Sequence, residues 1–171
     1  MHPGDVLAEP APELPLRPPA HRVSPRAKTW WRLRGLATLI VFLVPQLGIL
    51  VLAAGPFPTV TVVLTLLLGT AYLLVVPPLL FRITRWEVTD RAVYTLTGWV
   101  VREWRIAPIS RVQTVDTERG PLQQLLRLAT VTVTTASARG AVRIHGLDQD
   151  AAAELARMLT ETTHATPGDA T

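Results

Sequence analysis

The sequence predicts a helical membrane hairpin joined to a small, mostly β domain, and two observations lead to this prediction. From Gly35 to Phe81 the 171-residue chain contains no Asp, Glu, Lys or Arg. One helical crossing of the ~30 Å hydrocarbon layer takes about 20 apolar residues, so this run suffices for two crossings and a tight turn. After Phe81 the pattern changes to short alternating runs separated by turn residues, which is typical of antiparallel strands.

The chain begins with a proline-rich arm, residues 1–27, which has few large apolar side chains. Such a segment cannot bury enough apolar surface to offset the entropy of ordering it, so we expect it to be disordered. A docking peptide built on Pro18 and Pro19 is the alternative, but a plain tail is the simpler interpretation.

The hairpin is expected over residues 28–81, with spans at Leu36–Ala54 and Thr59–Phe81 and a turn at Gly55–Pro58. Two prolines near the end of the second span, at positions 77 and 78, are expected to kink or fray it. Gln46 is the only strongly polar side chain in the first span. An intramembrane hydrogen bond to the second helix is the preferred role for its amide, and a ligand contact is the alternative.

Basic and aromatic residues border both outer ends of the apolar run. Tryptophan prefers the headgroup level, and Lys and Arg stay on the cytoplasmic side. The expected membrane-interface anchors are Lys28, Trp30, Trp31, Arg32, Arg34, Arg82, Arg85 and Trp86. No basic residue lies in the turn, so both termini are predicted to be cytoplasmic. A signal peptide does not fit the first span, because a second full span follows at once.

Residues 82–163 are expected to form the folded domain, a curled antiparallel sheet of six or seven strands capped by a helix. The pattern indicates strands at residues 81–88, 91–96, 99–106, 109–116, 130–135 and 142–145, with a short helix at 122–128. In the fifth of these strands Val131 and Val133 lie on one face, and Thr130, Thr132 and Thr134 lie on the other.

A C-terminal amphipathic helix follows Gly146. Asp148 suits its N-cap, and Asp150 suits the positive N-terminal end. The residues expected on its buried face are Ala152, Leu155, Met158, Leu159 and Thr162. Residues 164–171 are expected to be a disordered tail.

Composition excludes several classes of function. Without cysteine the chain has no disulfide, no thiolate metal site and no Cys nucleophile. The net charge of +4 is modest and lies mainly before the first span, so nucleic acid is not an expected partner.

One block of the domain, PISRVQTVDTERGPLQQLLRLATVTV at residues 108–133, resembles the bacterial pleckstrin-homology-like domain of YdbS-like membrane proteins. The similarity extends to WEVTD at residues 86–90, to GLD at 146–148 and to the two spans, so that it covers residues 28–163. One departure is Arg127, where many members have glycine.

This resemblance implies a pleckstrin-homology-type fold, a sandwich or barrel of two nearly orthogonal sheets closed by a C-terminal helix. It also implies a bacterial inner-membrane protein, the short members of the family being expected beside a longer protein with several such domains. It brings no catalytic motif, and a fold does not define a function.

No catalytic constellation is evident, and we expect neither an enzyme nor a cofactor or metal. HExxH, Walker, GxSxG and EF-hand patterns are absent from the sequence. His145 is expected to be a rim histidine rather than a ligand. Asp116 and Glu118 have same-face strand spacing, but beside Arg111 and Arg119 a solvent ion pair is preferred over a general acid–base pair.

Two functions remain open. In the first, the domain mediates assembly with a larger membrane protein or a second copy. In the second, the protein binds a lipid headgroup or small ligand at the inner leaflet. The second needs basic side chains clustered on one face, and the candidates for such a face are Arg102, Arg105, Arg111, Arg119 and Arg143. Acidic residues alternate with them, which favours a mixed, solvated surface. Trp86, Trp99 and Trp104 are interpreted as core or interface residues.

Overall fold

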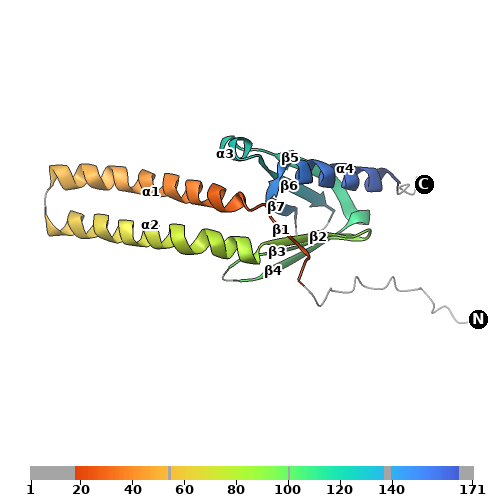
Figure 1. The fold of residues 1–171 in the computed structure, drawn as a ribbon, viewed down its shortest axis with the longest axis horizontal. Helices are drawn as coiled ribbons and strands as arrows, with labels where there is room; N and C mark the ends of the chain where they lie inside the picture. Colours follow the sequence, from red (N-terminus) through yellow and green to blue (C-terminus); the bar gives the residue numbers. More distant parts are fainter. Residues whose placement is uncertain (1–17, 54, 100, 137–139, 166–171) are drawn as a thin grey trace, which may run out of the picture.

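The computed structural model describes residues 18–53, 55–99, 101–136 and 140–165. Two long helices lie side by side and extend from one end of a small β domain (Figure 1). α1 spans Ala27–Leu52 and α2 spans Pro56–Ile83, and both are long and apolar enough to cross a membrane. Most of their apolar surface is not covered by the rest of the chain. Exposing an apolar surface of this size to water is unfavourable, so the hairpin requires lipid around it.

Two glycines allow α1 and α2 to approach closely. A β-carbon on Gly69 of α2 would overlap Leu39 of α1. A β-carbon on Gly35 would lie 2.9 Å from both Leu73 Cδ2 and Tyr72 Cε1. Small residues at such contacts are a common way for membrane helices to pack, because lipid offers no hydrophobic drive for association.

Both helices are longer than the predicted spans. α1 begins nine residues before Leu36, and α2 begins at Pro56 rather than Thr59. Proline suits the first helical position because that N–H has no intrahelical partner. The prediction that the helix frays at Pro77 and Pro78 is wrong, since α2 continues to Ile83. Val76 and Pro77 are buried, so tertiary packing holds the helix through positions that local rules disfavour.

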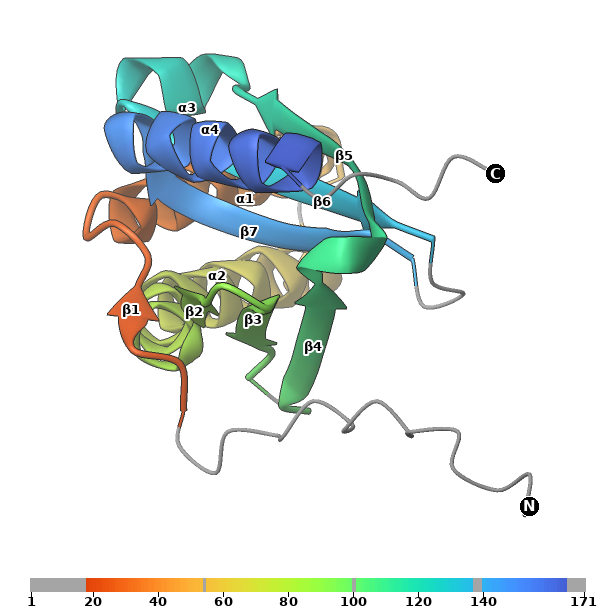
Figure 2. The same ribbon diagram turned by 90° about the vertical axis from the view of Figure 1, so that its right-hand side faces the viewer.

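In the described part of the chain, seven strands form two antiparallel sheets that pack face to face (Figure 2). The four-stranded sheet has the order β1-β2-β3-β4, with β1 His21–Arg22, β2 Arg85–Val88, β3 Ala92–Thr97 and β4 Glu103–Pro108. The three-stranded sheet has the order β5-β6-β7, with β5 Val112–Glu118, β6 Leu128–Thr135 and β7 Val142–Asp148. Among the described residues no ladder joins the two sheets, so the fold is the predicted curled sandwich and not a closed barrel.

Several strand boundaries differ from the prediction. The first expected strand begins at Arg85 because α2 occupies residues 81–83. The third begins at Glu103 rather than Trp99, because Gly98 adopts a φ of 92° and turns the chain away. A 3₁₀ turn, η1 Ile109–Arg111, precedes β5. The short helix α3 spans only Pro121–Leu125, since the chain reverses at Arg127, which has a φ of 54°.

The prediction that residues 1–27 form a disordered arm is partly wrong, because the last residues of this segment belong to the domain. His21 and Arg22 pair with Trp86 and Arg85 and thereby complete the four-stranded sheet. Val23 is 2% exposed and is almost fully buried. The membrane hairpin is therefore inserted between the first and second strands of the sandwich. A two-residue strand in a proline-rich segment has no alternating pattern, so sequence periodicity could not detect it. Residues 1–17 lie outside the described residues.

The core lies between the sheets and beneath α4, Gln149–Ala165. Ala152, Leu155 and Leu159 of α4 are buried in it, as predicted, together with Val131 and Val133 of β6. Met158 was expected on the same face but is 45% exposed. The side chain of Thr162 lies outside the described part. The helix continues to Ala165, two residues into the expected tail, and the rest of that tail is not described.

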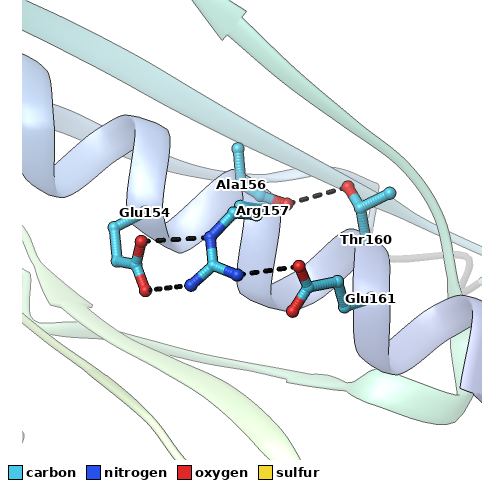
Figure 3. A network of polar contacts seen from close by, with 5 residues as sticks. All are labelled: Glu154, Ala156, Arg157, Thr160 and Glu161. Carbon is cyan, nitrogen blue, oxygen red and sulfur yellow. Dashed lines mark hydrogen bonds and ion pairs between the residues drawn. The ribbon is translucent and has the colours of Figure 1, made fainter.

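The outer face of α4 is polar. Arg157 bridges Glu154 and Glu161, with Nη2–Oε1 and Nη1–Oε1 distances of 2.6 and 2.8 Å (Figure 3). The hydrogen bond and charge of Arg157 lower the pKa of Glu154. These exposed pairs identify the outer face of α4 as a water-facing surface.

Candidate functional site

The predicted membrane anchors separate into two groups. Lys28, Arg32, Arg34 and Arg82 lie on the domain ends of α1 and α2. Lys28 Nζ lies 4.6 Å from the centre of the Phe81 ring, which joins the two helices at this level. This end of the hairpin therefore carries the charges expected at a membrane surface.

The other anchors lie where the hairpin joins the domain. Trp30 is only 7% exposed, so its expected headgroup contact is wrong; it packs at the junction beside Trp31, with ring centres 6.1 Å apart. Arg85 and Trp86 lie in β2. Trp86 Nε1 donates to the Arg22 carbonyl at 3.3 Å. The fold uses these side chains to hold β1 and the hairpin to the sandwich.

A groove of about 630 Å³ runs between α1 and α2. Trp31 and Arg34 lie at its domain end. The remaining lining combines small, polar and apolar residues: Gly35, Thr38, Leu39, Phe42, Thr65, Leu68, Gly69 and Tyr72. This groove was not predicted from the sequence. Its signal is the helical spacing of Gly35, Thr38 and Phe42 on α1 and of Thr65, Gly69 and Tyr72 on α2.

Gln46 forms the hydrogen bond to the second helix that its position suggested. Its Nε2 donates to Thr65 Oγ1 at 3.0 Å, and the Thr65 hydroxyl lies 3.1 Å from Gln46 Oε1, placed to donate in return. Neither polar group is thus left unpaired in the hydrocarbon layer, where this is costly. Thr65, which also lines the groove, was not identified from the sequence.

We expect the Gln46–Thr65 pair to contribute a modest part of hairpin stability. Interhelical hydrogen bonds of this kind are worth roughly 0.6–2 kcal/mol. A double-mutant cycle with Gln46→Leu and Thr65→Val, measured by reversible unfolding of the purified protein in bicelles, should give a coupling energy in this range. Ile40→Val, on the far side of α1, is the control. Strictly additive single effects would show that the two side chains do not interact.

The domain contains a row of hydrogen-bonded polar side chains between α3 and the three-stranded sheet. Gln123 is 5% exposed, and its Nε2 donates to Thr130 Oγ1 at 2.9 Å. The same hydroxyl lies 3.4 Å from His145 Nδ1. His145 itself is exposed, as expected for a rim position. Partial desolvation of its ring, and then the positive charges of Arg143 and Arg34, lower the pKa of His145. These hydrogen bonds hold α3 against the sheet, which is a structural role.

The charged side chains do not build a single basic face. Arg105 lies in β4, where its Nη2 is 2.7 Å from Glu103 Oε1. In the other sheet, Thr132 of the central strand β6 pairs with Arg143 of β7 on one side and with Asp116 of β5 on the other. That face therefore mixes charges of both signs. Within the described ranges no group of three metal-binding side chains comes together.

A helix-capped sandwich of two antiparallel sheets, with a membrane hairpin between β1 and β2, defines a membrane-anchored protein of pleckstrin-homology type. Residues 30–163 match the family model described as "Bacterial PH domain", and the chain belongs to this family. It is 30% identical over 129 residues to the UPF0699 transmembrane protein YdbS of Bacillus subtilis (strain 168), a match that covers 70% of this chain and 78% of YdbS. No solved structure matches the chain.

Proposed function

We propose that this protein is a non-catalytic assembly factor whose hairpin groove receives a transmembrane helix of a partner, either a larger membrane protein or a second copy. The observation that supports the proposal is the groove itself, which lies between the two helices and has the apolar side chains of Phe42, Leu68 and Tyr72 in its lining. Thr38, also in the lining, donates its hydroxyl to the Arg34 carbonyl at 3.0 Å, and its oxygen can accept an interhelical hydrogen bond. The domain would supply additional contact area, since stable interfaces usually exceed about 1,000 Å².

We also propose that the protein resides in the bacterial inner membrane with both ends in the cytoplasm. Because β1 pairs with β2, the chain on either side of the hairpin lies on one side of the membrane. The basic residues at that end favour the cytoplasm. An impermeant maleimide should modify Gly55→Cys in intact cells and leave Ala153→Cys unmodified, and the reverse pattern would contradict this orientation.

A second candidate function has its own support in the groove. Arg34 and Trp31 lie where the groove meets the membrane surface. A guanidinium and an indole at this level suit an anionic lipid headgroup whose acyl chains occupy the apolar part. Lipid binding is therefore the alternative occupant of the same groove.

Photo-crosslinking in native membranes separates the two functions. The chain has no cysteine, so Thr38→Cys can carry a benzophenone maleimide inside the groove. Ile40→Cys, which faces away from the groove on the same helix, is the matched control. We expect a protein adduct of defined mass from Thr38→Cys and much less from Ile40→Cys.

Native mass spectrometry of the full-length protein completes the test. If no protein adduct forms, and if the purified protein retains a phospholipid that Arg34→Gln loses, then the groove is a lipid site and the assembly proposal is wrong.

A further inference from the structure

The exposed apolar side chains of the domain are concentrated in two places. In the connection from β3 to β4, Trp99 is 56% exposed and Val101 is 75% exposed. In α3, Leu125 is 78% exposed. Trp104 and Leu122 extend these two sites, and among the described residues of the domain only Met158 is a comparable large exposed apolar residue elsewhere. We call these two sites the β3–β4 tip (residues 98–104, except residue 100) and the α3 tip (residues 121–125).

Both tips lie at the end of the domain from which the hairpin extends. Figure 1 shows α3 beside the domain end of α1, and the β3–β4 connection beside the domain end of α2, whereas α4 extends toward the opposite end. Figure 2, viewed from the domain side, places α3 and β4 on opposite sides of the hairpin axis. The tips therefore flank the hairpin at two separate places.

The length of the hairpin places this end of the domain close to the lipid surface. α1 has 26 residues, and at 1.5 Å per residue it is about 39 Å long. The hydrocarbon layer is ~30 Å thick, and the headgroup layers bring the bilayer to about 40–45 Å. The charged residues of α1 all lie between Ala27 and Arg34, so we place these first turns of the helix in the headgroup layer. The domain then begins at the outer edge of the headgroup layer.

The tips also carry the charge that a headgroup layer attracts. Arg102 follows Val101, and Arg119 lies two residues before the start of α3; both arginines are exposed. Aromatic and aliphatic side chains beside arginine are suited to the boundary between headgroups and acyl chains. Water-facing α4, by contrast, carries the Glu154–Arg157–Glu161 network.

We propose that the β3–β4 tip and the α3 tip insert into the headgroup region of the membrane that holds the hairpin. The domain is then attached to the bilayer at three places, and its orientation relative to the membrane is fixed. This contact does not depend on what occupies the hairpin groove, because neither tip lines the groove.

Spin labels on single cysteines test this contact in the full-length protein. We would label Val101→Cys and Leu125→Cys and reconstitute each variant alone into vesicles of phosphatidylcholine and phosphatidylglycerol. Leu67→Cys, exposed on α2 within the span, is the lipid control, and Ala153→Cys, exposed on α4, is the water control. All four positions are on the surface, so the labels do not disturb the core.

Power saturation of the label signal with oxygen and with a water-soluble nickel chelate then reports depth. At both tips we expect the oxygen-to-nickel ratio to rise severalfold above that of Ala153→Cys, toward the value of Leu67→Cys. Ratios equal to that of Ala153→Cys would overturn the proposal. Protection of both tips from both reagents would also overturn it, because this would indicate that a second copy of the chain covers them instead of lipid.

Discussion

Replacing Leu155 with aspartate is expected to unfold the β domain. Leu155 is 3% exposed and belongs to the core between α4 and the sheets. An uncompensated buried charge costs about 3–5 kcal/mol, and truncating the leucine costs about 2–5 kcal/mol more. The sum is comparable with the whole stability of a small domain, about 5–15 kcal/mol. Limited proteolysis of the full-length protein in detergent should show rapid cleavage after residue 84 while the hairpin stays protected.

The matched control is Ala153→Asp, which places the same charge on the exposed side of α4, two residues away. It should leave the protease pattern and the melting temperature nearly unchanged. The experiment needs the full chain, because residues 82–163 alone lack β1. Wild-type protection of Leu155→Asp would mean that α4 does not pack against the sheets as the structure shows.

Removing the segment before the hairpin is expected to destabilise the domain on the far side of it. Val23 and Ala27 are buried, and the Ser24 N–H donates to the Gly146 carbonyl at 2.9 Å. Without this segment β2 becomes an open edge with unpaired backbone groups, which favours aggregation. Val23→Asp should therefore cost about 3–5 kcal/mol and expose the domain to protease.

Truncated chains give the same test without a new charge. A chain that begins at residue 18 keeps β1 and should melt like the full-length protein, whereas one that begins at residue 28 should aggregate or melt at a much lower temperature. Arg22→Asp, at an exposed side chain of β1, is the control for Val23→Asp. Equal melting temperatures for the two truncated chains would show that β1 does not contribute to the stability of the domain.

Local chemistry and periodicity determined the elements whose signal lies within one stretch of chain. The uncharged run between Arg34 and Arg82 requires lipid because nothing in a chain of this size could bury it. The spacing of Ala152, Leu155 and Leu159 predicts the buried face of α4 because a helix brings such positions together. The resemblance at residues 108–133 then predicts the sandwich.

The interior of the hairpin depends on contacts between its two helices. Gln46 was evident as a polar residue in lipid, but its partner Thr65 is identified only when the helices are packed together.

Tertiary structure alone decided the features that join distant parts of the chain. β1 exists because β2 offers it a free edge some 60 residues later, and pairing across that separation leaves no local pattern. Trp30 is likewise buried only in the folded chain, although its type and position indicate a headgroup anchor. The groove and the two apolar tips are likewise defined by how helices and loops are placed in space, which hydrophobic periodicity within one element does not encode.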